Sequence, residues 1–98
     1  MRFEFSDPDL EEVYYDRNAS LGISPAVDKG FRKVIWRIAA APNELVLRQI
    51  GGLHYHKLAR PRDHQHGLNI TKQWRLIVER QDDEGETWLL IVAVEDYH

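Results

Sequence analysis

A run of seven consecutive apolar residues near the end of the chain restricts the fold more than any other feature. Residues 88–94 read Trp-Leu-Leu-Ile-Val-Ala-Val, and a continuous apolar run of this length is typical of a strand buried on both faces, which usually lies in the middle of a sheet. The chain continues directly into Glu95, Asp96, Tyr97 and His98. We therefore expect a rigid element to hold an acid, a phenol and an imidazole in place.

Length and composition indicate one ordinary globular domain covering residues 1–98. The chain has 98 residues, of which 43% are hydrophobic and 30% charged, outside the range of disordered sequences. It contains no cysteine, which excludes disulfides, thiolate chemistry and Cys-ligated zinc. The start lacks the pattern of a signal peptide, and no apolar stretch approaches the roughly 20 residues that span a bilayer. We expect a soluble, cytoplasmic protein.

Charge is distributed unevenly along the chain. The net charge is only −3, which by itself argues against a nucleic-acid partner. However, residues 29–80 carry eleven Lys and Arg against three acids, whereas residues 1–28 and 81–98 are acidic. The middle of the chain can therefore supply a basic surface if the fold gathers these side chains, although a solvated helix face would explain the same pattern.

The first half of the chain predicts a strand over residues 2–5 followed by two helices. Pro8 and Pro25 each follow a residue that can cap a helix; the candidate caps are Ser6 or Asp7 for the first helix and Ser24 for the second. The second helix has one apolar face at helical spacing, formed by Val27, Phe31, Val34, Ile35 and Ile38. Gly30 interrupts this helix, which indicates either a locally weak helix or the close approach of another backbone.

The second half predicts strands. Residues 43–50 form at most a short third helix, and the irregular residues 53–67 are expected to be a loop or a frayed edge strand because Pro61 cannot pair in a sheet interior. Three strands follow, near residues 68–70, 74–78 and 88–94, separated by a tight turn at 71–73 and a polar hairpin loop at 81–86. This order predicts an α+β fold with two to three helices packed on one face of a small, mainly antiparallel sheet.

Histidines are the first candidates for chemistry. Four of the five form the pairs His54-x-His56 and His64-x-His66, and on a strand the members of each pair would share a face and could bind a divalent metal. The only nearby carboxylate is Asp63. The same residues could instead be exposed loop histidines without a role, or act in acid/base chemistry and phosphate contact.

Arg75 is the most informative basic residue because it interrupts an apolar strand. Alternation places Trp74, Leu76 and Val78 on one face and leaves Arg75 on the other. Such an arginine is either paired with an acid or held rigidly toward an oxyanion. An antiparallel hairpin would bring it across from residues 96–98.

Three parts of the sequence carry a family resemblance: residues 67–77 with the core Gln73-Trp74-Arg75, the acidic hairpin loop, and the terminal Asp96-Tyr97-His98. In these three places the chain resembles the HigB-like toxins of the RelE/ParE toxin-antitoxin superfamily. The resemblance covers essentially the whole chain. It implies a RelE-like fold and a toxin of a type II toxin-antitoxin system, a ribosome-dependent, metal-independent mRNA endoribonuclease that inhibits translation. It also implies two partners, mRNA in the ribosomal decoding site and a helix-turn-helix antitoxin of the HigA type, and no cofactor.

The resemblance also assigns roles to residues. Arg75 corresponds to the arginine that stabilises the scissile phosphate, the terminal group corresponds to the catalytic Asp96, Tyr97 and His98, and His56 corresponds to an upstream active-site histidine, with His54 as the alternative. Where the family has Leu-Lys-Gly, this chain has Leu58-Ala59-Arg60. The RNA-binding candidates are therefore His54, Lys57, Arg60, Arg62 and Lys72.

Two other interpretations stay open. A ParE-like toxin would use the same fold without catalysis to inhibit a protein target such as gyrase, and a degenerate member would retain only antitoxin binding. A small metal-dependent hydrolase would use the paired histidines. ParE-type relatives generally lack the terminal Asp-Tyr-His group, which favours the nuclease.

Overall fold

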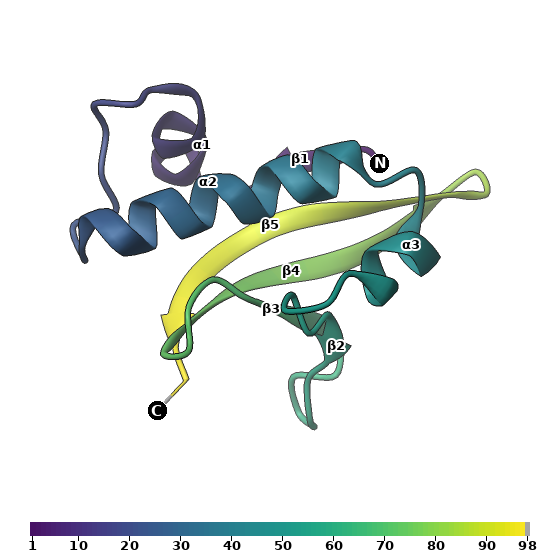
Figure 1. Cartoon of the computed structure of the whole chain (residues 1–98). Helices are drawn as coiled ribbons and strands as arrows, with labels where there is room; N and C mark the ends of the chain where they lie inside the picture. Colours follow the sequence, from purple (N-terminus) through teal and green to yellow (C-terminus); the bar gives the residue numbers. More distant parts are fainter. Residues whose placement is uncertain (98) are drawn as a thin grey trace.

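The structure is a computed structural model that describes residues 1–97. Three helices and five strands follow one another along the chain (Figure 1). Their order is β1 (Phe3–Phe5), α1 (Pro8–Tyr15), α2 (Pro25–Ala40), α3 (Glu44–Gln49), β2 (His56–Lys57), β3 (Gln65–Asn69), β4 (Trp74–Asp83) and β5 (Glu86–Asp96). No helix in the described part of the chain is both long and apolar enough to span a bilayer.

Both long helices begin where the cap and proline signals predict. The Asp7 side chain accepts a hydrogen bond from the backbone N–H of Asp9, and the Ser24 hydroxyl accepts one from Val27. These bonds satisfy amide groups that have no partner inside the helix. Of the two candidate caps for α1, Asp7 is therefore the one used.

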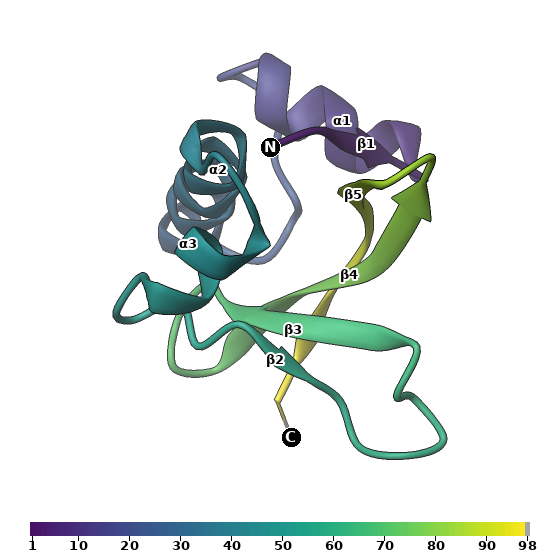
Figure 2. The same cartoon turned by 90° about the vertical axis from the view of Figure 1, so that its right-hand side faces the viewer.

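The five strands form one sheet in the order β1-β5-β4-β3-β2. All neighbours are antiparallel except β1 and β5, which run parallel. Figures 1 and 2 show the helices gathered on one side of this twisted sheet, with α2 lying across it. The predicted α+β architecture, with helices on one face of a mainly antiparallel sheet, is confirmed.

The core lies between α2 and the helix-facing side of the sheet. Phe31, Ile35 and Ile38 of α2 are fully buried against side chains of the two long strands; these strand residues are Leu76, Val78, Leu89 and Ile91. Gly30 lies where α2 meets the chain after β3, and a Cβ there would stand 3.1 Å from the Ile70 carbonyl oxygen. The glycine therefore permits the close backbone approach that its place in the helix suggested.

The C-terminal apolar run differs from the prediction in one respect. β5 is an interior strand, between β1 and β4, but β4 is the middle strand of the sheet. Leu89 and Ile91 are buried under the helices, whereas Leu90 and Val92 are only half-buried. The run is therefore not buried on both faces, because no layer of helices covers the second face.

A β-bulge interrupts the pairing of β4 with β5. Val78 pairs with Ile91, but the preceding residue, Ile77, pairs with Ala93, so Val92 is the extra residue. An extra residue reverses the alternation of side chains beyond it. As a result Glu95 and Tyr97 point to the face opposite the helices. Without the bulge, the regular alternation from Ile91 would have placed both side chains beneath the helices.

Two further expectations about the second half were only partly right. Residues 53–67 do contain an edge strand, the two-residue β2, and Pro61 lies in the loop after it. They also contain the start of β3 and several buried side chains, which the sequence did not predict; the buried ones are Leu53, Tyr55, Leu58 and His66. The polar loop over 81–86 is also shorter than expected. β4 continues through Asp83 and β5 begins at Glu86, leaving a two-residue turn at Glu84 and Gly85, both with positive φ.

Candidate functional site

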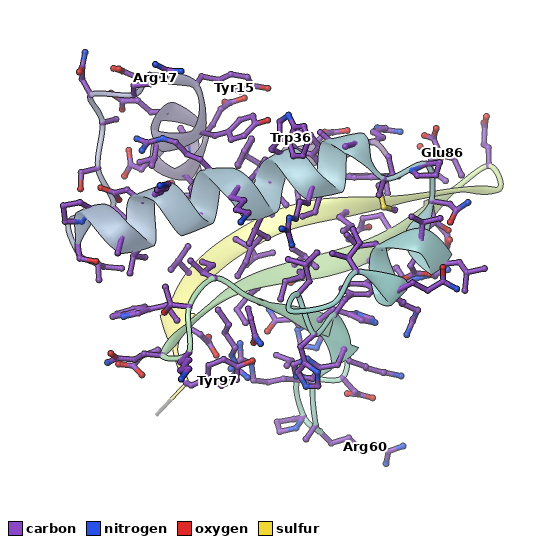
Figure 3. All side chains as sticks on the ribbon, viewed as in Figure 1. Tyr15, Arg17, Trp36, Arg60, Glu86 and Tyr97 are labelled. Atoms are coloured by element: carbon purple, nitrogen blue, oxygen red, sulfur yellow. The ribbon has the colours of Figure 1, made fainter. Side chains whose placement is uncertain are left out.

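The candidate site lies on the open face of the sheet, where β5 ends. Arg75 of β4 pairs across the sheet with Glu95 of β5 and with Asn69 of β3. Figure 3 shows Tyr97 at this end of the sheet, on the side away from α2, and Arg60 farther out on the loop after β2. The predicted placement of Arg75 opposite the core face is confirmed, since Leu76 and Val78 are in the core.

Two arginines share one carboxylate at the centre of the site. Arg62 donates to both oxygens of Glu95, through Nη1 to Oε1 at 2.7 Å and through Nη2 to Oε2 at 2.9 Å. Arg75 donates only to Oε1, from Nε at 3.1 Å and Nη2 at 2.5 Å. The bonds from Arg62, and then those from Arg75, lower the pKa of Glu95 although partial burial acts in the opposite direction. The trio therefore carries one net positive charge at neutral pH.

Tyr97 is held against Arg75 and β3. The Arg75 guanidinium carbon lies 4.8 Å from the centre of the Tyr97 ring, a cation-π contact. The Tyr97 hydroxyl donates to Oδ1 of Asn69, and its backbone N–H donates to the Gln73 carbonyl oxygen at 2.8 Å. These contacts fix both the phenol and the guanidinium at the end of the sheet.

His56 faces Arg75 across Gly67. A Cβ on Gly67 would lie 3.3 Å from Cε1 of His56, which is tighter than usual, and in ordinary contact with Cδ of Arg75 at 3.6 Å, so the glycine lets the imidazole lie close to the strand beside Arg75. Nδ1 of His56 lies 2.7 Å from the His54 carbonyl oxygen. Because a carbonyl oxygen only accepts, Nδ1 is the donor in this bond, and in the neutral form of the ring Nε2 is then the nitrogen that can accept a proton.

A cavity of about 450 Å³ opens beside these groups; its lining residues are His56, Lys57, Leu58, Ala59, Arg62 and Arg75. We call it the Arg75 cavity. It brings an imidazole and two guanidinium groups around one space, an arrangement suited to an anion such as a phosphodiester. Among the RNA-binding candidates, Lys57 and Arg62 line this cavity.

Other predicted site residues lie elsewhere. His54 is exposed beside His56, with the two rings 4.5 Å apart. Arg60 is 91% exposed and 3.9 Å from Asp63, and Lys72 lies in the turn between β3 and β4. Asp96 is paired with Trp74, so alternation turns it to the opposite face from Arg75, where Gln73 Nε2 donates to it. His98 lies outside the described residues.

The second histidine pair does not form a site with the first. His64 is exposed, whereas His66 is buried on the helix side, stacked on Tyr55 with ring centres 4.8 Å apart. Burial holds the pKa of His66 below its ordinary value. Within residues 1–97 no group of three or more His, Asp or Glu side chains is arranged to hold a metal ion, so the paired-histidine metal site finds no support there.

Three members of the site carry no signal that sequence patterns could supply. No pattern predicts a role for Glu95 or Asn69, because their side-chain directions depend on the bulge and on the pairing of three strands. Gly67 separates His56 from Arg75, which are 19 positions apart in the chain. Only cross-strand register brings these residues together.

Comparison with known proteins shows the fold. The structure is similar to that of a YoeB/ParE toxin from Agrobacterium tumefaciens, with a TM-score of 0.61 over 100% of both chains and 10% sequence identity. The sequence matches no protein-family model and no curated protein. The chain therefore has a RelE/ParE-like toxin fold, as its sequence resemblance implied.

Proposed function

We propose that this protein is the toxin of a type II toxin-antitoxin system and acts as a ribosome-dependent mRNA endoribonuclease that inhibits translation. The observation that carries the proposal is the Arg75 cavity, where the basic Nε2 of His56 and the guanidinium of Arg75 flank one glycine. The similarity in fold to a YoeB/ParE toxin over the full chain supports the same class of protein.

The proposed reaction uses the 2′-hydroxyl of the RNA as its nucleophile. His56 Nε2 removes the 2′-proton, and the oxygen attacks the adjacent phosphorus. Arg75 stabilises the negative charge that develops on the phosphoryl oxygens. The bond to the 5′-oxygen breaks, that oxygen takes a proton from a general acid, and a 2′,3′-cyclic phosphate is left. Only proton transfer, positioning and charge stabilisation are required, so the reaction needs no metal ion.

The terminal residues complete the proposed site. His98 directly follows Tyr97 and is the candidate general acid, while Tyr97 positions RNA through its ring. Asp96 is the candidate to orient or tune an imidazole of the site, and its hydrogen bond from Gln73 supports a role in fixing the chain that leads to His98. The proposed partners are mRNA in the ribosomal decoding site and a HigA-like helix-turn-helix antitoxin.

A purified translation system tests the proposal. The protein should cut a translated message and leave the same message intact without ribosomes, as read by primer extension. Arg75→Ala and His56→Gln should each slow cleavage by about a hundredfold or more. Arg17→Ala, which removes an exposed arginine on the helical side, is the matched control and should cut normally. Normal cutting by both site variants would contradict the assignment.

One observation favours a second candidate. The Glu95 carboxylate forms ion pairs with both Arg62 and Arg75, as expected if the site no longer bound RNA. A ParE-like toxin that inhibits a protein target such as gyrase would need no nuclease site. Expression that induces DNA damage while messages stay intact would favour this alternative.

A further inference from the structure

We propose that Glu95 is a positioning residue. Its carboxylate binds Arg75 as an RNA phosphate would, and it thereby sets how strongly the site binds phosphodiesters. The inference deepens the proposed function, on which it rests, since it concerns the substrate of the same site. Glu95 itself does not touch the substrate, and it acts only through the two arginines that bind it.

The unequal hydrogen bonding of the trio is the first support. Arg62 binds both carboxylate oxygens in the bidentate geometry that is the strongest arginine-carboxylate arrangement. Arg75 shares only Oε1, which already accepts from Arg62. When an incoming phosphate competes, Arg75 is therefore the partner that exchanges, and Arg62 keeps Glu95.

The position of the carboxylate is the second support. Arg62 and Arg75 both line the Arg75 cavity, and Glu95 is not among its lining residues. An anion that enters from the cavity meets the guanidinium of Arg75 without first meeting the carboxylate. Nη1 of Arg75 makes no hydrogen bond to any residue in the range 1–97, so it is available for the first contact.

The third support is the confinement of Arg75. Its side chain is 17% exposed, fixed by Glu95 on one side and by the Tyr97 ring on another. A long side chain held this way loses little freedom when it binds a ligand. Glu95 thus has two opposing effects: it holds Arg75 in position until the phosphate arrives, and its negative charge then competes with the phosphate for the same guanidinium group.

Glu95→Gln separates these effects and Glu79→Gln is its matched control. Glu79 lies on the same face and accepts a hydrogen bond from Gln65 at 3.2 Å rather than from an arginine. Binding of a fluorescent, 2′-O-methylated single-stranded RNA, which cannot be cut by 2′-attack, is measured across a salt series. Glu95→Gln should bind about fivefold more tightly at low salt, and its plot of log K against log salt should steepen by about 0.7. Glu79→Gln should stay within about twofold of the parent with an unchanged slope.

If Glu95→Gln and Glu79→Gln changed RNA affinity and salt slope equally, the proposal would be overturned, because the effect of Glu95 would then be that of any lost negative charge. Glu95→Asp, which keeps the carboxylate, should restore the parental slope, and a slope like that of Glu95→Gln would contradict the positioning role. Since the probe is not cleavable, a protein that behaves as predicted here but never cuts mRNA would refute the proposed nuclease alone.

A measurement on the unaltered protein covers the case in which Glu95→Gln does not fold. Inorganic pyrophosphate is titrated while the Nε–H signals of the arginines are followed by NMR. The Arg75 signal should shift to saturation, because its Nε leaves Glu95. The Arg62 signal should stay, because its Nε donates to Gln65 Oε1 at 3.0 Å. No shift at Arg75, or an equal shift at Arg62, would overturn the exchange.

Discussion

Replacing Gly67 by alanine tests whether His56 and Arg75 act on one phosphate across this glycine. The added methyl group would lie 3.3 Å from both His56 Cε1 and Leu58 Cδ2, and 3.6 Å from Arg75 Cδ. Carbon atoms prefer separations of about 3.5–4.0 Å, so the neighbours must yield by a few tenths of an ångström. Leu58 is buried and has little room, whereas His56 is partly exposed and can turn outward.

The expected loss is therefore mainly of activity. Overpacking costs roughly 1–3 kcal/mol. Replacing a glycine within a strand also reduces the conformational entropy lost on folding, which stabilises the protein by about 0.5–1 kcal/mol. We expect a net destabilisation of about 1 kcal/mol. Displacement of a catalytic group by a fraction of an ångström to 1 Å lowers rates by up to about a hundredfold, so mRNA cleavage should fall by roughly tenfold to a hundredfold.

Two assays on the same preparations separate these quantities. Urea unfolding gives the change in stability, and single-turnover cleavage of a translated message gives the change in rate. Gly51→Ala is the matched control, because no atom lies within 4 Å of the position its Cβ would take and its φ is not positive. If Gly67→Ala cut RNA at the parental rate, His56 and Arg75 could not be acting together across this position.

Three further predictions concern the scaffold and the terminus. Gly30→Ala should lower the free energy of unfolding by about 1–2 kcal/mol despite its better helix propensity, because the methyl group would meet Ile70 Cγ2 at 2.9 Å; urea unfolding with unchanged stability would contradict this packing. Burial lowers the pKa of His66, so the unfolded chain binds a proton first and stability should fall as pH drops below about 6.5. His66→Phe, which can still stack on Tyr55, should flatten that slope between pH 7.5 and 5.5, and equal slopes would refute the assignment. Deleting residues 96–98 should abolish cleavage while largely sparing the fold by circular dichroism, and a truncated protein that still arrested growth would show that the terminus is dispensable.

Local signals predict the helices and the direction of Arg75 well. Helix starts depend on a capping side chain and a proline within two residues, and alternation within β4 depends only on strand geometry. The start of α1 at Pro8 and the placement of Arg75 away from the core follow from such local physics. At Gly30 the local signals leave a weak helix and a close backbone approach as alternatives, and only the packing of Ile70 against this position decides for the second.

The remainder of the site depends on contacts between distant parts of the chain. An apolar run cannot reveal a bulge, since Val92 looks the same whether or not it pairs. This bulge nevertheless decides that Glu95 and Tyr97, rather than Asp96, face Arg75. Likewise, the sequence predicts a loop or a frayed edge strand around His66, whereas the structure buries this side chain in a stack on Tyr55. Register and long-range packing thus determine which of the candidate side chains meet.

The chemistry at the 2′-hydroxyl tests the proposed nuclease most directly. A message carrying a single 2′-deoxynucleotide at its main cleavage position is translated in the presence of the protein, beside the all-RNA message, and the new ends are analysed. We predict that the all-RNA fragments end in a 2′,3′-cyclic phosphate and that the deoxy position is not cut. Cleavage of both messages at that position, or fragments ending in a 3′-hydroxyl, would contradict the roles assigned to His56 and Arg75.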